Sequence, residues 1–475
     1  MAIVDSGLAR LARRINGSLI LPGDQAYQRV RKLFIGRIHE VLPRAIVRCA
    51  DPRDVVAALA FARGHRLPFA IRSGGHSFAE YSTTDGLLID LGAMDSVQVR
   101  PGTVTTGPGT LLGPLAARLA EYNRLVPCGW CPGVGVAGAV LGGGYGTLSR
   151  LYGLGADHLL AAQVVLADGR VVWADEMREP ELFWALRGAG GGNFGVVTAM
   201  TLMTRPAVPV VTVHCRWPYG HAARVIEEWQ RWAPAAEDEI NIELGVFASG
   251  FPDEPLSVAA FGVMALPADT ARRRLAEFVE RVGAAPDLLE LGELDARAAA
   301  RHHAYAGDAG DGIEPDPLPA GERPGLRMSK SEFFDRPLPA AAVGELLTGF
   351  AEGRGTGIAR DLEFVPWRGA IGRVSPDATA FVHREPLFLL KHAVQTGCRA
   401  TDERRRDARR WLVRSWSTTH PYGSGGVYPN YPDPDLSGWE QAYYGDNLAR
   451  LRAAKAEYDP ASLFRFEQSI PAGVG

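Results

Sequence analysis

Two glycine-rich stretches are the most informative part of this chain: Arg72-Ser73-Gly74-Gly75-His76-Ser77 and, beginning 55 positions after His76, Cys131-Pro132-Gly133-Val134-Gly135. Each sets one reactive side chain among residues that let the backbone approach a ligand closely. A histidine nitrogen and a cysteine sulfur that both lie against one flat, electrophilic ring system can each bond to it covalently. The pair therefore predicts two anchors for one flavin.

Other interpretations of these residues remain open. Either residue taken alone could be structural, because glycines mark turns that need a positive φ or a close backbone approach. Cys128 and Cys131 also form a C-x-x-C. A zinc site would need two further ligands, and the other three cysteines are scattered singly along the chain (Cys49, Cys215 and Cys398). A thioredoxin-like pair would lie at the start of a helix after a strand, whereas this segment continues into a glycine run.

Length and composition narrow the class of protein. With 475 residues the chain is longer than one hydrophobic core supports, so two domains are expected. Its 46% apolar and 22% charged residues are ordinary for a globular protein, and a net charge of -3 argues against a nucleic-acid surface. No secretory signal and no apolar stretch of the ~18 residues needed to cross a bilayer is visible. We expect a cytoplasmic monomer or homodimer that binds small molecules, without nucleic acid, membrane or metal.

The pattern of apolar residues predicts an α+β chain. Residues 20–205 alternate short strands with helices: a strand at 45–48, a helix at 53–63 opened by Asp51-Pro52, and a strand at 69–72 that leads to the His76 loop. Asp168-Gly169 lies between two strand-like runs and indicates a hairpin.

Longer strands and helices follow from about residue 207, which predicts a second α+β unit. Its segment 307–325, rich in Gly, Pro and acidic residues, is expected to be a surface loop near the substrate entrance. A helix is expected over 438–455. The predicted domains are an FAD-binding domain at 1–206, a substrate domain at 207–430, and a segment at 431–475 that returns to the first domain.

Two glycine patterns bear on cofactor binding. Gly190, Gly192 and Gly195 match G-x-G-x-x-G, but the dinucleotide fingerprint follows a strand and opens a helix, whereas this one follows a helix and opens a strand. A Rossmann site is therefore rejected. The run Gly142-Gly143-Gly144-Tyr145-Gly146 is a better candidate, because successive residues without Cβ let backbone N–H groups converge on an anion or a ring lie against the main chain.

Further motifs follow the two anchors in order along the chain: Cys131 through Gly146 with Leu148 and Arg150-Leu151-Tyr152-Gly153-Leu154, Phe183-Trp184-Ala185-Leu186-Arg187-Gly188, Gly192-Asn193-Phe194-Gly195-Val196-Val197, and Tyr428 to Asp433. Together with residues 72–77 they resemble the berberine bridge enzyme-like family, FAD-linked oxidases with the FAD-binding fold of vanillyl-alcohol oxidase. The match covers about residues 20–205 and 360–470. It implies a two-domain PCMH-type FAD-binding fold whose substrate domain is an antiparallel sheet covered by helices.

The resemblance also implies roles for particular residues. His76 would carry the flavin 8α-methyl and Cys131 the flavin C6, which withdraws electron density from the ring and raises its power to accept a hydride. Tyr428 matches the tyrosine that serves as base in many relatives, and a nearby positive or electron-poor flavin would help lower its pKa from about 10. Asn430 would contact the flavin, and Val134 would leave O2 access to it. The full set of predicted cofactor contacts is Arg72, Ser73, Gly74, Gly75, His76, Ser77, Cys131, Val134, Gly135, Gly138, Gly142, Gly143, Gly144, Gly146, Leu148, Tyr152, Gly195, Val196, Val197 and Asn430.

The chain departs from the family pattern at two positions. Phe78 stands where sugar-oxidising relatives have a second active-site tyrosine, and Ala139 replaces a histidine that often contacts the flavin. Four further residues in the strands that should face substrate are expected to be structural or solvated rather than catalytic: Glu363, Trp367, Glu385 and Lys391.

The sequence thus predicts a bicovalent FAD oxidase. It would remove a hydride from an alcohol, an amine or a ring-forming C–H of a bulky small molecule, pass the electrons to O2 to give H2O2, and serve in secondary metabolism. Two rivals stay open. One is a flavin dehydrogenase with another electron acceptor, and the other is a non-redox cyclase in which FAD is only a wall of the pocket.

Overall fold

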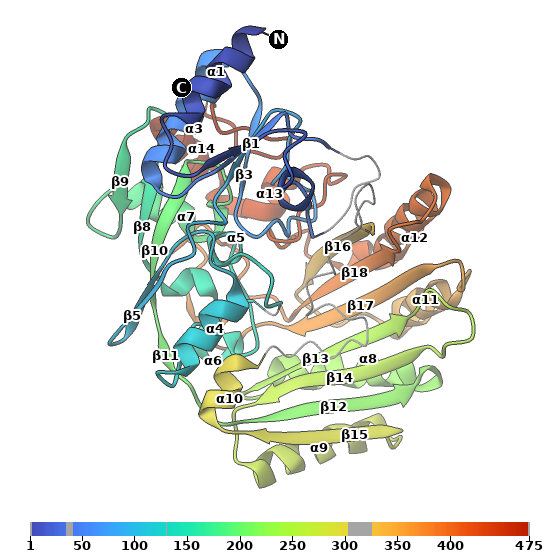
Figure 1. The fold of residues 1–475 in the computed structure, drawn as a ribbon. Coiled ribbons are helices and arrows are strands. Elements are labelled where there is room, and N and C mark those ends of the chain that lie inside the picture. The colour runs from blue at the N-terminus through green and yellow to red at the C-terminus, as the bar shows by residue number, and fades with distance from the viewer. Residues whose placement is uncertain (1, 35–40, 130, 303–324, 474–475) are drawn as a thin grey trace.

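The computed structural model describes residues 2–34, 41–129, 131–302 and 325–473. Figure 1 shows two layered parts, one of three small sheets with their helices from the first 206 residues, the other a large sheet from later residues. The chain after α12 (Asp402–Thr419) crosses back to the first part. The two parts meet along the wall of the cavity described below.

A four-stranded sheet carries the His76 loop. Its order is β1 (Ser18–Ile20), β2 (Ala45–Arg48), β4 (Leu87–Asp90), β3 (Phe69–Arg72), with β2 and β3 parallel to β4. The helix α3 (Pro52–His65) begins as the sequence predicts, because the Asp51 carboxylate accepts the N–H groups of Arg53 and Asp54. The strand β3 then ends four residues before His76.

A five-stranded antiparallel sheet supports the Cys131 side. Its order is β5 (Val97–Arg100), β6 (Thr103–Thr106), β10 (Val196–Met203), β8 (Leu159–Val165), β9 (Val171–Ala174). The predicted hairpin at Asp168-Gly169 joins β8 to β9. A short pair, β7 (Arg124–Leu125) and β11 (Arg205–Pro206), lies at the edge of this part.

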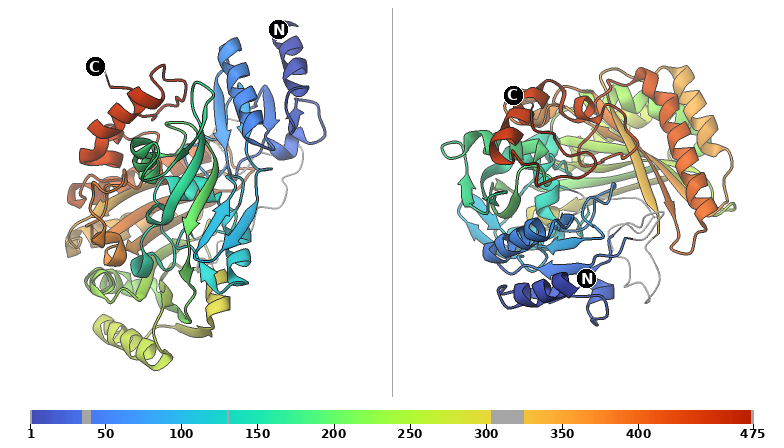
Figure 2. Two further views of the ribbon diagram at one scale, coloured as in Figure 1. Left: turned by 90° about the vertical axis from the view of Figure 1, so that its left-hand side faces the viewer. Right: turned by 90° about the horizontal axis from the view of Figure 1, so that it is seen from above.

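A seven-stranded antiparallel sheet forms the second part. Its order is β15 (Leu288–Leu294), β12 (Val210–Pro218), β14 (Ser257–Met264), β13 (Ile240–Ala248), β17 (Ile358–Pro366), β18 (Phe388–Thr396), β16 (Arg327–Phe334). Four helices cover one face, as Figure 2 shows for α11 and α12: α8 (Ala222–Trp232), α9 (Ala268–Val282), α11 (Ala340–Ala351) and α12. Alternation along β17 turns Leu362 and Phe364 toward these helices and leaves Glu363 for the opposite face.

The remaining helices are α1 (Ala2–Ala12), α2 (Tyr27–Val30), α4 (Leu112–Ala120), α5 (Val136–Leu141), α6 (Ser149–Tyr152), α7 (Pro180–Ala189), α10 (Ala296–Arg301), α13 (Trp439–Tyr444) and α14 (Leu448–Tyr458). The prediction of one helix over 438–455 is wrong, because Gly445 has a φ of 47° and separates α13 from α14. The predicted loop is not described by the structure over 307–324.

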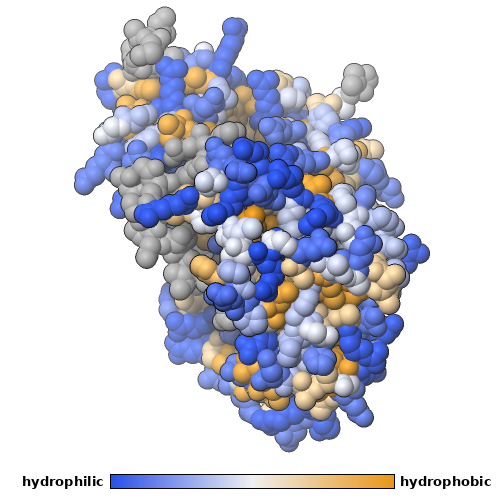
Figure 3. Space-filling model, turned by 90° about the vertical axis from the view of Figure 1, so that its right-hand side faces the viewer, coloured by the Kyte–Doolittle hydropathy of each residue, from blue (hydrophilic) through white to orange (hydrophobic). Residues whose placement is uncertain are grey.

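None of the described helices is both long and apolar enough to span a bilayer. Figure 3 shows one face on which hydrophilic residues predominate and apolar residues occur in small groups. Scattered apolar residues of this kind are normal on a folded protein.

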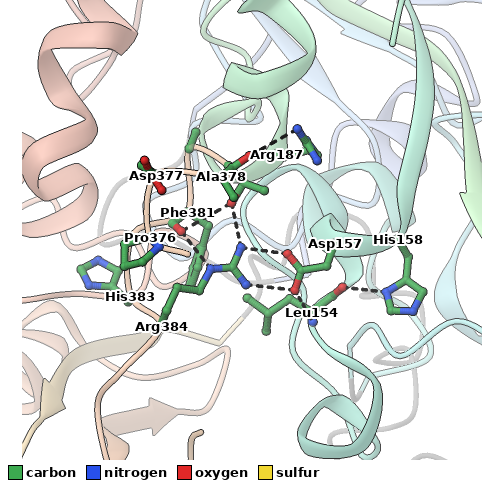
Figure 4. Close-up of polar contacts among 12 residues, drawn as sticks. Leu154, Asp157, His158, Arg187, Pro376, Asp377, Ala378, Phe381, His383 and Arg384 are labelled. Carbon is green, nitrogen blue, oxygen red and sulfur yellow. Dashed lines mark hydrogen bonds and ion pairs between the residues drawn. The ribbon is translucent and has the colours of Figure 1, made fainter. Parts of the chain in front are cut away.

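One buried ion pair ties the two parts together (Figure 4). Both nitrogens at the end of Arg384 donate to Asp157, at 2.9 Å to Oδ2 and 2.8 Å to Oδ1, and the arginine side chain is fully buried. Asp157 also accepts the backbone N–H of Leu154, while Arg384 donates to the Phe381 carbonyl. The pair therefore joins the segment before β8 to the loop between β17 and β18.

Replacing Arg384 with alanine should lower the free energy of unfolding by about 3–5 kcal/mol, because the Asp157 carboxylate would stay buried without its partner. The matched control is Arg373→Ala, which removes an ion pair to Asp238 whose arginine is 63% exposed and should cost less than about 1 kcal/mol. Urea unfolding of both variants measures the difference. Equal losses would contradict the larger contribution of the Asp157 pair to stability.

Candidate functional site

The His76 and Cys131 loops lie in direct contact, and glycine makes this possible. A Cβ placed on Gly74 would lie 2.3 Å from the backbone nitrogen of Gly135, and one placed on Gly135 would lie 2.1 Å from Ser73 Oγ. No larger residue fits at either position without moving backbone. The close approach brings His76 and Cys131 to the wall of one cavity.

This cavity has a volume of 370 Å³, within the range of small-molecule and cofactor sites. Its wall comes from regions of the chain that lie far apart in sequence, between Phe34 and Gln468. Most of the predicted site residues are on it: Ser73, Gly74, Gly75, His76, Ser77, Cys131, Val134, Gly135, Gly138, Gly142, Gly144, Gly195, Val196, Val197, Tyr428 and Asn430.

Arg72 does not line the cavity, contrary to the prediction. Its guanidinium is buried and donates to backbone carbonyls, at 2.6 Å to Val30, 3.3 Å to Arg31 and 3.0 Å to Ser82. Burial lowers the pKa of Arg72 to about 10, which leaves it charged at neutral pH. The residue holds the protein backbone.

Four other predicted contacts also lie off the cavity. A Cβ on Gly143 would point at the rings of Phe381 and Tyr428, and Gly146 packs on the backbone of Gly129. The remaining two side chains are used elsewhere: Leu148 lines a separate small pocket, and the Tyr152 hydroxyl donates to the Pro206 carbonyl at 3.2 Å.

The rejected G-x-G-x-x-G segment does contribute to the cavity. The segment follows α7 and precedes β10, as the sequence indicates, so it has no dinucleotide-type helix N-terminus. Gly190, Gly191 and Gly192 nevertheless line the wall. The glycine spacing was the available signal. Because it was compared only with the dinucleotide-binding fold, the contribution of these glycines to the cavity was not predicted.

His76 is held as a neutral imidazole. Its ring stacks on Phe34 with centroids 3.9 Å apart and planes 16° from parallel. Burial, with the charge of Arg327, lowers the pKa of His76 to about 4, and a hydrogen bond with the Gly133 backbone opposes the shift only partly. At neutral pH one ring nitrogen therefore keeps its lone pair.

The Tyr428 hydroxyl oxygen accepts three hydrogen bonds. The donors are the backbone N–H groups of Gly144 at 2.9 Å and Tyr145 at 3.4 Å, and Asn430 Nδ2 at 3.2 Å. Burial raises the pKa of Tyr428 above its ordinary value, and these donors act in the opposite direction. In the protein alone, desolvation of the phenolate outweighs these donors. The lowering expected beside an electron-poor flavin stays a prediction.

A second polar group lies on the same wall. Tyr145 shares a short hydrogen bond with Tyr431 and donates to Glu363 Oε1 at 3.4 Å, while Lys391 Nζ bonds the other Glu363 oxygen. Burial raises the pKa of both tyrosines well above the ordinary value, so both are protonated. The Glu363 and Lys391 side chains are buried and line the cavity, so they are not solvated, and sequence reasoning gave Tyr145 and Tyr431 no role.

The other residues noted in the sequence take different places. Phe78 lines the cavity with its ring edge-on to Tyr431, and the Ala139 carbonyl accepts a hydrogen bond from Asn430 Nδ2 at 2.9 Å. Trp367 is fully buried and donates to the His383 carbonyl at 2.9 Å, whereas Glu385 is exposed.

The two cysteines of the C-x-x-C lie in different surroundings. Burial raises the pKa of the Cys128 thiol to about 12, which keeps it protonated, and only Cys131 of the two lines the cavity. Within the described ranges, no group of three His, Cys, Asp or Glu side chains could hold a metal ion.

The C-terminal segment forms part of the cavity wall and is hydrogen-bonded to the first part of the structure. Lys455 Nζ donates to the carbonyls of Asn193 at 2.6 Å and Phe464 at 2.7 Å, and the Tyr81 hydroxyl donates to Gln468 at 2.9 Å. These bonds join the segment after α13 to the cavity wall near Gly192.

Comparison with known proteins gives consistent matches along the chain. Residues 43–175 match the model described as FAD binding domain, and residues 427–471 match berberine and berberine like. An FAD-linked oxidoreductase of Bacillus subtilis, YvdP, is 32% identical over 96% of this chain and 98% of the relative. The chitooligosaccharide oxidase of Gibberella zeae is 30% identical over 90% of this chain and 87% of its own. Among solved structures, Physcomitrella patens BBE-like 1 superposes with a TM-score of 0.85 at 25% identity, covering 99% of this chain and 100% of the other.

Proposed function

Because the chain belongs to the berberine bridge enzyme-like family of FAD-linked oxidases, we propose that its cavity holds FAD through covalent bonds from both His76 and Cys131. The observation that carries this proposal is the meeting of the two side chains on one cavity, although 55 positions separate them in sequence. The neutral imidazole of His76 supports it, since bond formation uses a nitrogen lone pair.

The residues present fit FAD. Backbone without Cβ lines the cavity at Gly142, Gly144 and Gly190–Gly192, where a flat ring or a pyrophosphate can lie against main chain. Asn430 occupies the space beside Gly142, where a Cβ would lie 2.1 Å from its Oδ1. The four polar side chains of the cavity wall that are left to contact the substrate are those of Tyr145, Tyr431, Glu363 and Lys391.

The proposed attachment balances with O2 as oxidant. Each linkage exchanges a C–H bond of the cofactor and the N–H of His76 or the S–H of Cys131 for one C–N or C–S bond. The two protons and two electrons released convert O2 to H2O2. The linked cofactor is left oxidised, ready for turnover.

The substrate of the proposed oxidase is a bulky small molecule of secondary metabolism with an oxidisable alcohol, amine or ring-forming C–H. When bound, FAD supplies the acceptor for a hydride, and O2 takes the electrons as H2O2. Tyr428 is the base that takes the substrate proton, because its oxygen faces three N–H donors that stabilise negative charge. Tyr145 and Tyr431, protonated at neutral pH, serve as donors to the substrate.

Reoxidation in air tests the acceptor. Enzyme reduced by light under argon should recover its oxidised spectrum within seconds of mixing with air-saturated buffer and should release one H2O2 per flavin. Flavin that stays reduced in air but recovers with an artificial quinone would instead support a dehydrogenase. Substrate conversion without any bleaching of the flavin under argon would support the non-redox cyclase.

A further inference from the structure

The backbone of residues 30–32, which lies beside the His76 loop, is held by the buried side chain of Arg72. Its guanidinium donates to the carbonyls of Val30, Arg31 and Lys32, at 2.6, 3.3 and 3.4 Å. Three consecutive carbonyls bound by one rigid, planar group leave this backbone little freedom. Phe34 follows two residues after Lys32.

Phe34 connects this backbone segment to His76. Its backbone N–H donates to the Gly75 carbonyl at 3.3 Å, next to the histidine, and its ring lies flat on the imidazole with centroids 3.9 Å apart. Phe34 also lines the cavity. The imidazole is thus held from the ring face by Phe34, while Gly133 bonds its edge.

We propose that Phe34, set in place by Arg72, is a positioning residue for covalent attachment at His76: it holds the imidazole plane so that one nitrogen faces the cofactor. The inference rests on the proposed function, since it concerns how one of the two linkages forms. Stacking fixes the rotation of the ring about its own side chain, which a hydrogen bond at a single edge atom does not. Bond formation needs the reacting atoms held near contact with aligned orbitals, and small misplacements are costly.

The low pKa of His76 agrees with this arrangement. An aromatic ring against the imidazole excludes water from one face, and burial is the largest cause of the shift to about 4. The stack therefore supplies both the orientation and the neutral form that attachment requires.

The test isolates one linkage at a time. In a Cys131→Ala background, FAD retained after acid precipitation reports His76 attachment alone, and in a His76→Ala background it reports Cys131 attachment alone. Phe34→Leu should slow attachment in the first background by about 10–100-fold and leave it unchanged in the second. Phe34→Tyr, which keeps the stack, should restore it.

A matched control addresses general damage to the fold. Phe61 packs against His65 in α3, away from the cavity, with ring centroids 4.2 Å apart and planes tilted by 31°, so Phe61→Leu makes the same change at another Phe–His pair. It should leave His76 attachment unchanged. Full attachment in Phe34→Leu with Cys131→Ala would overturn the role of Phe34 alone. Absence of attached FAD from Cys131→Ala with Phe34 intact would overturn the His76 anchor itself, and the positioning role with it.

Discussion

His76→Ala and Cys131→Ala should each retain one FAD per chain after acid precipitation, and the double variant should release all of it. Each side chain lines the cavity from its own loop, so under the proposed attachment the loss of one leaves the other bond in place. Each single variant should also reduce its flavin about tenfold more slowly, because one electron-withdrawing substituent is lost and the ring becomes a weaker hydride acceptor. Intact mass and anaerobic stopped-flow absorbance measure the two effects.

The control for this experiment is Cys128→Ala. Cys128 belongs to the same C-x-x-C, but its thiol is buried and protonated, and the residue does not line the cavity. Its loss should leave both linkages intact. Release of all FAD by either single variant would contradict two independent anchors, and retention by the double variant would require a different attachment residue.

Tyr428→Phe should slow flavin reduction by substrate about 10²–10⁴-fold while the amount of linked FAD stays unchanged. The substitution removes the proton acceptor and leaves the donors of Gly144 and Asn430 without their partner. Burial raises the pKa of Tyr428, so in the wild type the phenolate fraction and the reduction rate should keep rising above neutral pH. The phenylalanine variant should lose this rise.

Tyr431→Phe is the comparison for that prediction. Tyr431 lies three residues away on the same wall, but its hydroxyl is paired with Tyr145 and stays protonated. Its loss should affect substrate binding more than the reduction rate at saturation. A pH-dependent slowing in Tyr431→Phe, with Tyr428→Phe unaffected, would place the base at Tyr431.

Local chemistry was predictable from the sequence. The cap at Asp51 and Pro52 marks the start of α3, and the hairpin at Asp168-Gly169 lies where the turn residues place it. The meeting of His76 and Cys131 on one cavity was also predicted, because both lie in motifs whose glycines permit close packing.

The sequence did not show which residues of a motif face the cavity or which are buried elsewhere. Within the run 142–146, Gly142 and Gly144 line the cavity whereas Gly143 and Gly146 do not, a division set by backbone dihedrals and by packing against Phe381 and Gly129. The contact of Tyr145 with Glu363 spans 218 positions, a separation that no local pattern encodes.

The electrostatic environment of the charged and phenolic side chains could not be predicted either, because it depends on how deeply each side chain is buried. A charged residue in a strand is usually exposed, which led to the expectation that Glu363 and Lys391 are structural or solvated. Both are instead buried, paired with each other and on the cavity wall. The direction of the Tyr428 pKa depended on its burial, which the sequence does not record.

The most direct test of the account is peptide mapping of acid-denatured wild-type protein by mass spectrometry. The account predicts a yellow pellet with one FAD per chain, in which the same cofactor joins the peptide containing His76 to the peptide containing Cys131. A colourless pellet with free FAD in the supernatant, or FAD on neither of these residues, would contradict it.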